Sequence, residues 1–268
     1  MKVQETATVP DARMHSAEGG RGAVALLDAL GIKGRMDDPR KTAEELDFVF
    51  QMASNAAVNE LYPPFKKYFS DDFIIIDTPR FYCLGDTLLM AWFEEKPSPM
   101  LLQRRDGIFA ILMGQLVQMV VLYGLVKGFL FRGAIATGEY VECGGSGTVG
   151  GRVTMGNALS EASMWYDNAE WAGVCLTPTA AAGYEVMKGE FDARYGTGAR
   201  KSWDIYQRYD LPVKGQPPLP KTWVLKWHET LKDKRERIQS LMLGKSVDLG
   251  VARKMQNTLD FFDSCTSD

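Results

Sequence analysis

Two aspartates stand where apolar stretches of the chain meet turns, and there a buried strand can present a carboxylate to a site. Asp28 follows the apolar run 23–27 (AVALL), and Asp86 lies within 83–90 (CLGDTLLM). Two carboxylates that converge can hold a pair of divalent ions, which activate a hydroxyl beside a polyphosphate. The pattern predicts such a site at Asp28 and Asp86, with ordinary strand-end aspartates as the alternative.

Apolar and helical periodicities indicate the elements that must position these aspartates. Strand patterns cover 22–28, 73–77, 81–92, 129–137, 172–177 and 222–227, and helical patterns cover 41–69, 101–126, 158–170, 178–188 and 228–243. Strands 73–77 and 81–92, joined by the turn 78–80, are typical of a hairpin with Asp86 in or beside the connection. Strands interspersed with helices, including at least one hairpin, predict an α/β sandwich with a mixed sheet.

Composition narrows the class of protein. A length of 268 residues, with 46% hydrophobic and 24% charged residues, suits one large globular domain with a sizeable core. The net charge of −3 gives no general basic field, so we expect no nucleic-acid partner, while a local positive pocket for a small phosphate ligand stays open. The four cysteines and two histidines are scattered, which argues against zinc, a redox motif or a His-based triad. We expect unpaired thiols in a reducing cytoplasm.

One segment is apolar enough to raise the question of a membrane span. Residues 108–131 are almost wholly apolar, but Gln115 and Gln118 lie inside the segment and three glycines interrupt it. The pattern favours a buried helix over 101–126, ended by Lys127 and Gly128, and no stable membrane insertion. The first 20 residues are polar and are typical of a loose arm rather than a secretory signal, so we expect a cytoplasmic protein.

Six segments, in this order along the chain, resemble motifs of the class III nucleotide cyclase catalytic domain. Segment 28–32 (DALGI) is similar to the strand end with the first metal aspartate and the phosphate loop, and 82–86 (YCLGD) to the hairpin with the second metal aspartate. The other four segments are 58–61 (VNEL), 132–138 (RGAIATG), 156–164 (GNALSEASM) and 213–215 (VKG). The resemblance covers about residues 20 to 228 and implies a mixed, mainly antiparallel sheet flanked by helices. We expect a flexible arm at 1–20, a cyclase domain at 21–228 and a helical extension at 229–268.

The resemblance implies roles for individual residues. Asp28 and Asp86 would hold two Mg²⁺ or Mn²⁺ ions against a nucleoside triphosphate, and Lys214 would be a mobile positive charge on the triphosphate. The N–H groups that would cradle the phosphates are those of Ala29, Leu30 and Gly31. The family also implies a head-to-tail homodimer, with each site assembled from both subunits.

Two departures from the family pattern bear on catalysis. Ser160 stands where the family has its transition-state asparagine, and Met164 stands where it has an arginine. A lost arginine removes a cation from the phosphate charge that develops in the transition state. Arg132, Arg152 and Lys214 are candidates to replace it.

A third departure bears on the base. Tyr82 takes the position of the lysine that recognises the base in purine cyclases, and Val153 takes the position of its partner aspartate. Neither of the two residues that recognise a purine is therefore present. A tyrosine can stack on a ring and offer a hydroxyl to an edge group, and its bulk narrows the pocket. This pattern resembles the bacterial pyrimidine cyclases of Pycsar antiphage systems. It implies cyclic UMP or cyclic CMP made from UTP or CTP and sensed by a separate effector.

Other interpretations stay open. One is a purine cyclase that recognises its base through an unusual pair of residues. Another is a catalytically inactive, cyclase-like dimer that binds nucleotide or a protein partner. Tyr82 is equally explained as a packing residue of the hairpin, and Arg132 as an ion-paired strand residue at a dimer face. Asn157 and Ser160 are equally explained as helix N-terminal residues that satisfy free N–H groups.

Overall fold

A computed structural model describes residues 17–30, 37–61, 78–94, 96, 99–143, 153–196, 203–227, 234–243 and 249–265, and all structural statements below concern these residues. The strands are β1 (Glu18–Leu30), β2 (Arg80–Leu84), β3 (Thr87–Phe93), β4 (Leu130–Cys143), β5 (Val153–Met155), β6 (Val174–Leu176), β7 (Tyr206–Leu211) and β8 (Leu219–Leu225). The helices are α1 (Pro39–Ala56), the π-helical turn η2 (Ala57–Leu61), α3 (Leu102–Lys127), α4 (Asn157–Trp165), α5 (Pro178–Tyr195), α6 (Lys234–Leu243) and α7 (Leu249–Cys265).

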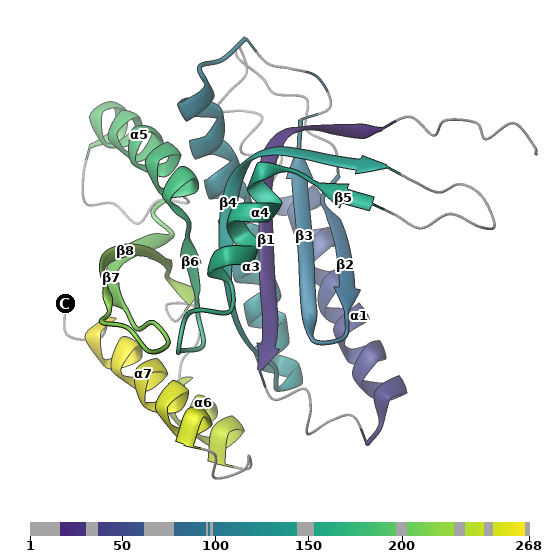
Figure 1. Cartoon of the computed structure of the whole chain (residues 1–268), viewed down its shortest axis with the longest axis vertical. Coiled ribbons are helices and arrows are strands. Elements are labelled where there is room, and N and C mark those ends of the chain that lie inside the picture. The colour runs from purple at the N-terminus through teal and green to yellow at the C-terminus, as the bar shows by residue number, and fades with distance from the viewer. Residues whose placement is uncertain are drawn as a thin grey trace, which may run out of the picture.

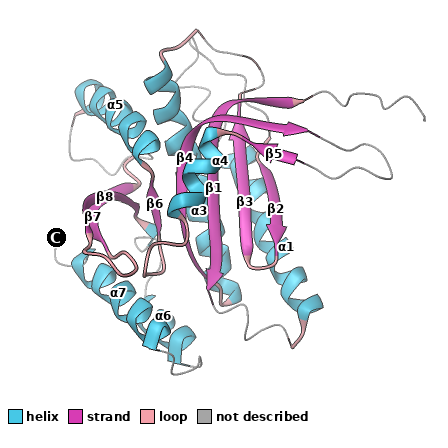
Figure 2. Ribbon diagram, in the orientation of Figure 1, coloured by secondary structure: helices cyan, strands magenta, loops and turns pink. Residues whose placement is uncertain are grey.

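The described strands form one mixed sheet, with helices on both of its faces (Figures 1 and 2). The strand order is β2-β3-β1-β4-β6-β8-β7, and β5 pairs with β4 away from this path. The β4–β6 pair is parallel and the other pairs are antiparallel. The structure thus confirms the predicted α/β fold with a mixed, mainly antiparallel sheet flanked by helices.

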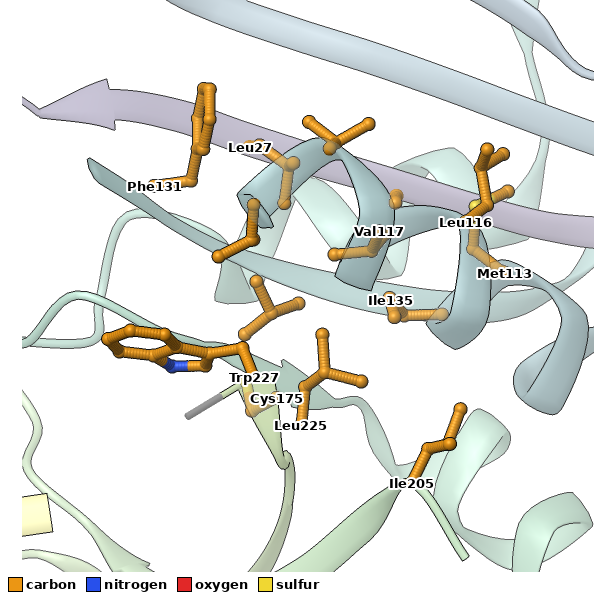
Figure 3. Close-up of a cluster of buried hydrophobic side chains, with 14 of the residues drawn as sticks. Leu27, Met113, Leu116, Val117, Phe131, Ile135, Cys175, Ile205, Leu225 and Trp227 are labelled. Carbon is orange, nitrogen blue, oxygen red and sulfur yellow. The ribbon is translucent and has the colours of Figure 1, made fainter. Parts of the chain in front are cut away.

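The central strand β1 is buried on both faces, and its alternate residues belong to two different cores. Ala23, Ala25 and Leu27 pack into the larger core with α1, α3 and α5, which is shown in part in Figure 3. Val24 and Leu26 pack into a smaller core that includes Ala158 and Ala162 of α4. Because strand side chains alternate between faces, Asp28 continues the row of Val24 and Leu26 and lies on the α4 face of the sheet.

The long apolar helix α3 is the core helix of this fold. It passes a length and hydropathy test for a membrane span, but 78% of its most apolar window is buried by the rest of the protein. The helix ends as predicted, because Gly128 adopts a left-handed φ of 80° and the N–H of Phe129 donates to the carbonyl of Gly124 at 2.8 Å. Its apolar surface is therefore accounted for by packing within the fold.

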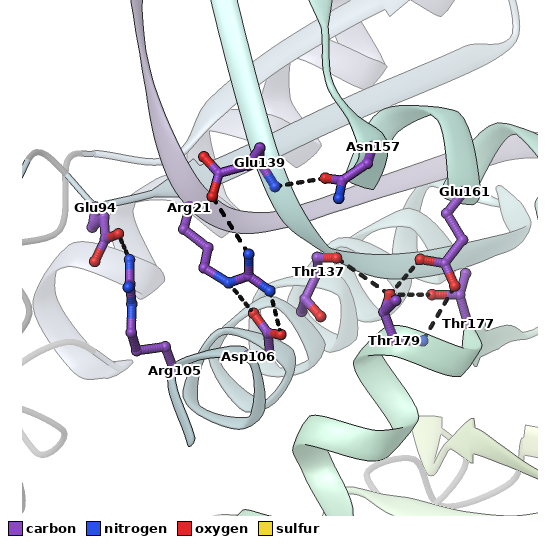
Figure 4. Close-up of polar contacts among 10 residues, drawn as sticks. All are labelled: Arg21, Glu94, Arg105, Asp106, Thr137, Glu139, Asn157, Glu161, Thr177 and Thr179. Atoms are coloured by element: carbon purple, nitrogen blue, oxygen red, sulfur yellow. Dashed lines mark hydrogen bonds and ion pairs between the residues drawn. The ribbon is translucent and has the colours of Figure 1, made fainter. Parts of the chain in front are cut away.

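Polar side chains fasten α3 and α5 to the sheet (Figure 4). Arg21 of β1 donates from Nε and Nη2 to the two carboxylate oxygens of Asp106, at 2.8 and 2.7 Å. The next residue of α3, Arg105, pairs with Glu94, which is almost completely buried. On the other side of β4, the hydroxyl of Thr179 at the start of α5 bonds to Glu161 of α4. These contacts join helices to strands and lie away from Asp28.

The sequence-based hairpin is corrected by the structure. A hairpin turn lies at Gly85 and Asp86, between β2 and β3, so the predicted strand 81–92 is two strands. Gly85 adopts a φ of 65°, a backbone conformation that residues other than glycine rarely adopt, and this allows the chain to reverse there. The predicted strand 73–77 lies outside the described residues.

Several predicted boundaries also differ. The helix predicted over 41–69 ends as α-helix at Ala56, the strand predicted over 129–137 continues to Cys143, and the helix over 178–188 continues to Tyr195. The predictions missed β7, and they gave no helix to the closing segment that forms α7. β1 begins at Glu18, within the predicted arm, and the proposed division into 1–20, 21–228 and 229–268 stays a prediction.

Candidate active site

The fold brings Asp28 and Asp86 together at one end of the sheet. Asp28 lies near the end of β1, directly opposite Thr87 at the start of β3, so Asp86 is the next residue beyond this pair. The N–H of Ala29 donates to the carbonyl of Asp86 at 2.9 Å, which fixes the two backbones side by side. Both aspartates are half-buried. The two aspartates are therefore neighbours along the backbone, as the predicted site requires, while convergence of their carboxylates on a metal stays a proposal.

Arg132 of β4 holds Asp28 in place. The two residues are cross-strand partners, and Nε and Nη2 of Arg132 each lie 2.7 Å from Oδ2 of Asp28. The remaining nitrogen, Nη1, donates to the carbonyl of Asp167 at 2.9 Å, in the segment after α4. Both side chains are about 15% exposed, at 14% and 16%, so this ion pair is largely shielded from solvent. Arg132 therefore orients one aspartate and ties it to the loop that follows α4.

The segment after Asp28 is strand rather than loop as far as Leu30. Ala29 and Leu30 pair with Phe131 and Leu130 of β4, and the N–H of Ala29 is already used by Asp86. The predicted phosphate cradle of Ala29, Leu30 and Gly31 can thus not use the N–H of Ala29 in this arrangement. Gly31 lies outside the described residues.

Lys214 lies in an exposed turn after β7. Its N–H donates to the carbonyl of Asn168 at 2.9 Å, which places the turn beside the loop that Arg132 contacts through Asp167. In the described part of the chain, the ammonium of Lys214 makes no hydrogen bond or ion pair. It therefore has the freedom that the predicted role as a movable cation requires.

Tyr82 lies on the same face of the sheet as Asp28. It pairs with Leu89, which pairs with Leu26, and residues directly opposite each other point to the same face. From this register, the Cα atoms of Tyr82 and Asp28 are roughly 12 Å apart, two strands across and two residues along. The Tyr82 hydroxyl donates to Glu142, which is buried and also accepts from Nη1 of Arg80 at 2.5 Å. Sequence reasoning missed Arg80 and Glu142, because β4 reaches Tyr82 only through its curved far end (Figure 1).

The start of α4 supplies a structural contact and two exposed side chains. Asn157 Oδ1 accepts the N–H of Glu139 at 2.7 Å and lies against Gly138, where a Cβ would come within 2.3 Å of it. Gly138 has a φ of 150°, so Asn157 braces a bend in β4. Ser160 and Met164 are exposed, and the Met164 side chain has 60% of its surface accessible. Asn157 thus has a bracing contact in this chain, whereas Ser160 is left available to a ligand or a second subunit.

The donor set fits hard divalent ions. Asp28 and Asp86 offer carboxylate oxygens, which Mg²⁺ and Mn²⁺ prefer. Arg132 contacts only Oδ2 of Asp28, and within the described residues Oδ1 and the Asp86 carboxylate make no hydrogen bond. The described residues contain no group of three or more histidine, cysteine, aspartate and glutamate side chains that would enclose a metal by itself. Water or a phosphate-bearing ligand would supply the other ligands.

Lys254, on α7, approaches the same site and was missed by the sequence analysis. Burial lowers the pKa of this lysine, the neighbouring charges of Arg132 and Lys214 lower it further, and Asp28 and Glu170 act in the opposite direction. The lysine is at least 40 positions from each of these neighbours and lies on a helix beyond the resembling segment, so no local signal in the sequence indicates the contact.

Comparisons with known proteins find structural likenesses of low score. No family model matches the chain, and no curated protein matches it. The guanylate cyclase domain of RhGC from Catenaria anguillulae in complex with GTP is 14% identical with a TM-score of 0.39, covering 78% of this chain and 97% of that one. A dimeric guanylyl cyclase domain of the RhoGC fusion protein from the aquatic fungus Blastocladiella emersonii is 10% identical with a TM-score of 0.41, covering 79% and 98%.

A third solved structure gives a similar result. The catalytic core of a rhodopsin-guanylyl cyclase with converted specificity, in complex with ATPalphaS, is 13% identical with a TM-score of 0.38 and covers 79% of this chain and 99% of that one. At such low identities and scores, these likenesses assign neither a family nor an activity to the chain. The functional argument rests on the residues of the site.

Proposed function

We propose that this protein is a nucleotide cyclase that converts a nucleoside triphosphate into its 3′,5′-cyclic monophosphate and pyrophosphate. The observation that carries the proposal is the convergence of Asp28 and Asp86 at adjacent positions of the sheet, with Arg132 bound to the first. These are the carboxylates that the resemblance to class III cyclases singled out in the sequence. Their neighbouring positions in the fold support a role for both aspartates as metal ligands.

The chemistry of the proposed reaction is an in-line displacement at phosphorus. The ribose 3′-oxygen forms a bond to the α-phosphorus, the bond from that phosphorus to the bridging oxygen of the β-phosphate breaks, and pyrophosphate leaves. The proton of the 3′-hydroxyl passes to solvent. Two Mg²⁺ or Mn²⁺ ions held by Asp28 and Asp86 would, when bound, lower the pKa of that hydroxyl and neutralise the leaving group.

The chain's own residues would hold the reactants in this geometry. Arg132 fixes the carboxylate of Asp28 through two short contacts, so that its Oδ1 keeps one direction. Lys214 would follow the triphosphate from its exposed turn, because an ammonium on a flexible stem is a movable point charge. Ser160, exposed on α4, would contact the substrate from one subunit of a homodimer, while Asn157 supports the α4 start.

The proposed substrate is a pyrimidine nucleotide, UTP or CTP, and the proposed context is a cytoplasmic antiphage system with a separate effector that senses the product. Tyr82 supports the choice of base, because it replaces the lysine of purine cyclases and lies on the Asp28 face. Its hydroxyl is held by Glu142, which would fix the ring as a wall against a single-ring base.

The test is to incubate the full chain with Mn²⁺ and each of ATP, GTP, CTP and UTP, and to identify products by mass. We expect a cyclic monophosphate from UTP or CTP, abolished in Asp28→Ala and in Asp86→Ala and retained in Asp47→Ala, an exposed aspartate of α1. Product from ATP or GTP alone would replace the pyrimidine proposal with a purine one. If folded, dimeric protein makes no product from any of the four nucleotides, the proposed cyclase activity is refuted and a nucleotide-binding role is favoured. Full activity in both site variants would refute the metal assignment.

A further inference from the structure

The C-terminal helix α7 is docked on the fold by buried contacts, beside β7 and β8 (Figure 1). Phe261 is completely buried, with its ring centroid 4.4 Å from that of Trp171 and 4.9 Å from that of Tyr209. The buried hydroxyl of Thr258 accepts the N–H of Ala172 at 2.8 Å. A helix held by a buried aromatic and a buried hydrogen bond has a fixed position relative to the sheet.

The docked face of α7 also carries Lys254. Residues 254, 258 and 261 are spaced by four and three positions, so they lie on one side of the helix. Thr258 donates its hydroxyl to the carbonyl of Lys254 at 2.6 Å, and Lys254 is half-buried beside the fully buried Thr258 and Phe261. The lysine side chain therefore leaves α7 on the side that faces the sheet rather than into open solvent.

The loop after α4 connects this lysine with the candidate active site. Asn257 of α7 donates to the carbonyl of Glu170 at 2.7 Å, and Arg253 lies 3.6 Å from the Glu170 carboxylate. Three residues earlier, the carbonyl of Asp167 accepts from Arg132, which holds Asp28. The same short loop thus binds α7 on one side and the Asp28–Arg132 pair on the other.

The charges of four groups act electrostatically on the Lys254 ammonium: Asp28, Arg132, Lys214 and Glu170. Within the described residues the ammonium makes no hydrogen bond and no ion pair, and Asp28 and Glu170 are already paired with Arg132 and Arg253. A half-buried ammonium without a direct counter-ion is costly unless an anion joins it. Arg132, the Lys214 turn and the Lys254 helix thus all border the same loop, through its residues 167, 168 and 170.

We propose that Lys254 is a phosphate-binding residue that contacts the triphosphate of the substrate from α7 and supplies positive charge where Met164 cannot. The inference rests on the proposed function and deepens it. The positive charge of Lys254 would stabilise the negative charge that accumulates on the departing pyrophosphate. The contact makes α7, which lies beyond the segment that resembles known cyclases, part of the binding site.

The test measures binding of two probes, inorganic triphosphate and UTP, by calorimetry in Mg²⁺ with the full chain. We expect Lys254→Met to raise the dissociation constant of both probes about tenfold, because one charge-assisted contact is lost. Lys254→Arg should keep affinity within about threefold, because it restores the charge. The control is Arg40→Met, which removes the same charge from an exposed position of α1 and should leave affinity within about twofold.

The outcomes separate this inference from the proposed function. If the unmodified protein binds neither probe and makes no cyclic product, the proposed function fails, and the inference fails with it. If the protein binds and cyclises, and Lys254→Met binds equally well or more tightly, the inference alone is overturned. If Lys254→Met does not fold, as judged by circular dichroism, Lys254→Gln takes its place, since it keeps a polar stem and loses only the charge.

Discussion

Replacing Phe261 by alanine tests whether α7 is an integral part of the fold. Phe261 is completely buried, and its ring contacts Trp171, Tyr209 and Trp227 at centroid distances of 4.4, 4.9 and 6.4 Å. Trp171 and Trp227 are themselves buried against other parts of the core, so they cannot collapse into the space that the missing ring leaves.

The expected loss in the free energy of unfolding is about 3–5 kcal/mol, the cost of a buried phenylalanine whose cavity stays open. The assay is urea unfolding followed by tryptophan fluorescence, together with hydrogen exchange of the α7 amides. Phe48→Ala is the matched control, because this phenylalanine of α1 is 40% exposed beneath Lys127 and should lose about 1 kcal/mol or less.

Two results would contradict this reasoning. A loss for Phe261→Ala no larger than that for Phe48→Ala would show that the ring does not contribute as a buried anchor. Unchanged exchange of the α7 amides in the Phe261→Ala protein would show that the helix does not depend on this contact.

Two further predictions concern charge. Asp28→Asn should lower the free energy of unfolding by about 1.5–3 kcal/mol, since Arg132 loses a charged partner in a site that is only 14–16% exposed, whereas Asp86→Asn should change it by less than about 0.5 kcal/mol. Urea unfolding of both proteins checks this, and equal losses would contradict the Arg132 contact. Stability should also fall above pH 10, because burial raises the pKa of Tyr206 and Tyr184 well above the ordinary value, so the unfolded chain loses protons first. The expected slope is about 1.4 kcal/mol per pH unit for each tyrosine.

The tyrosine prediction has its own control. Tyr206→Phe removes one titrating group and the 2.6 Å hydrogen bond from its hydroxyl to the carbonyl of Ala110. The variant should lose about 1 kcal/mol at neutral pH and then show a shallower fall between pH 10 and 12. An unchanged alkaline slope would mean that Tyr206 ionises at the same pH in the folded and unfolded protein.

The sequence by itself determined the pieces that local periodicity encodes. The apolar run before Asp28 is the buried central strand, and the long apolar segment with its glycine stop is the core helix α3. The order of strands and helices was enough for the mixed sheet, and the two aspartates stood out because each lies where an apolar stretch meets a turn. These features depend on neighbours within a few positions, which is the range over which side-chain pattern and backbone conformation are coupled.

Tertiary structure decided what these residues contact. The pairing of β1 with β3 and β4 sets Asp28 beside Asp86 and across from Arg132, and a shift of one residue would send Asp28 to the other face. Glu142 reaches Tyr82 through the curvature of β4, and Lys254 reaches the site because Phe261 docks a helix more than 200 residues from β1. Register, curvature and docking follow from contacts between distant segments, so the candidate site is assembled by packing that no local pattern of the sequence records.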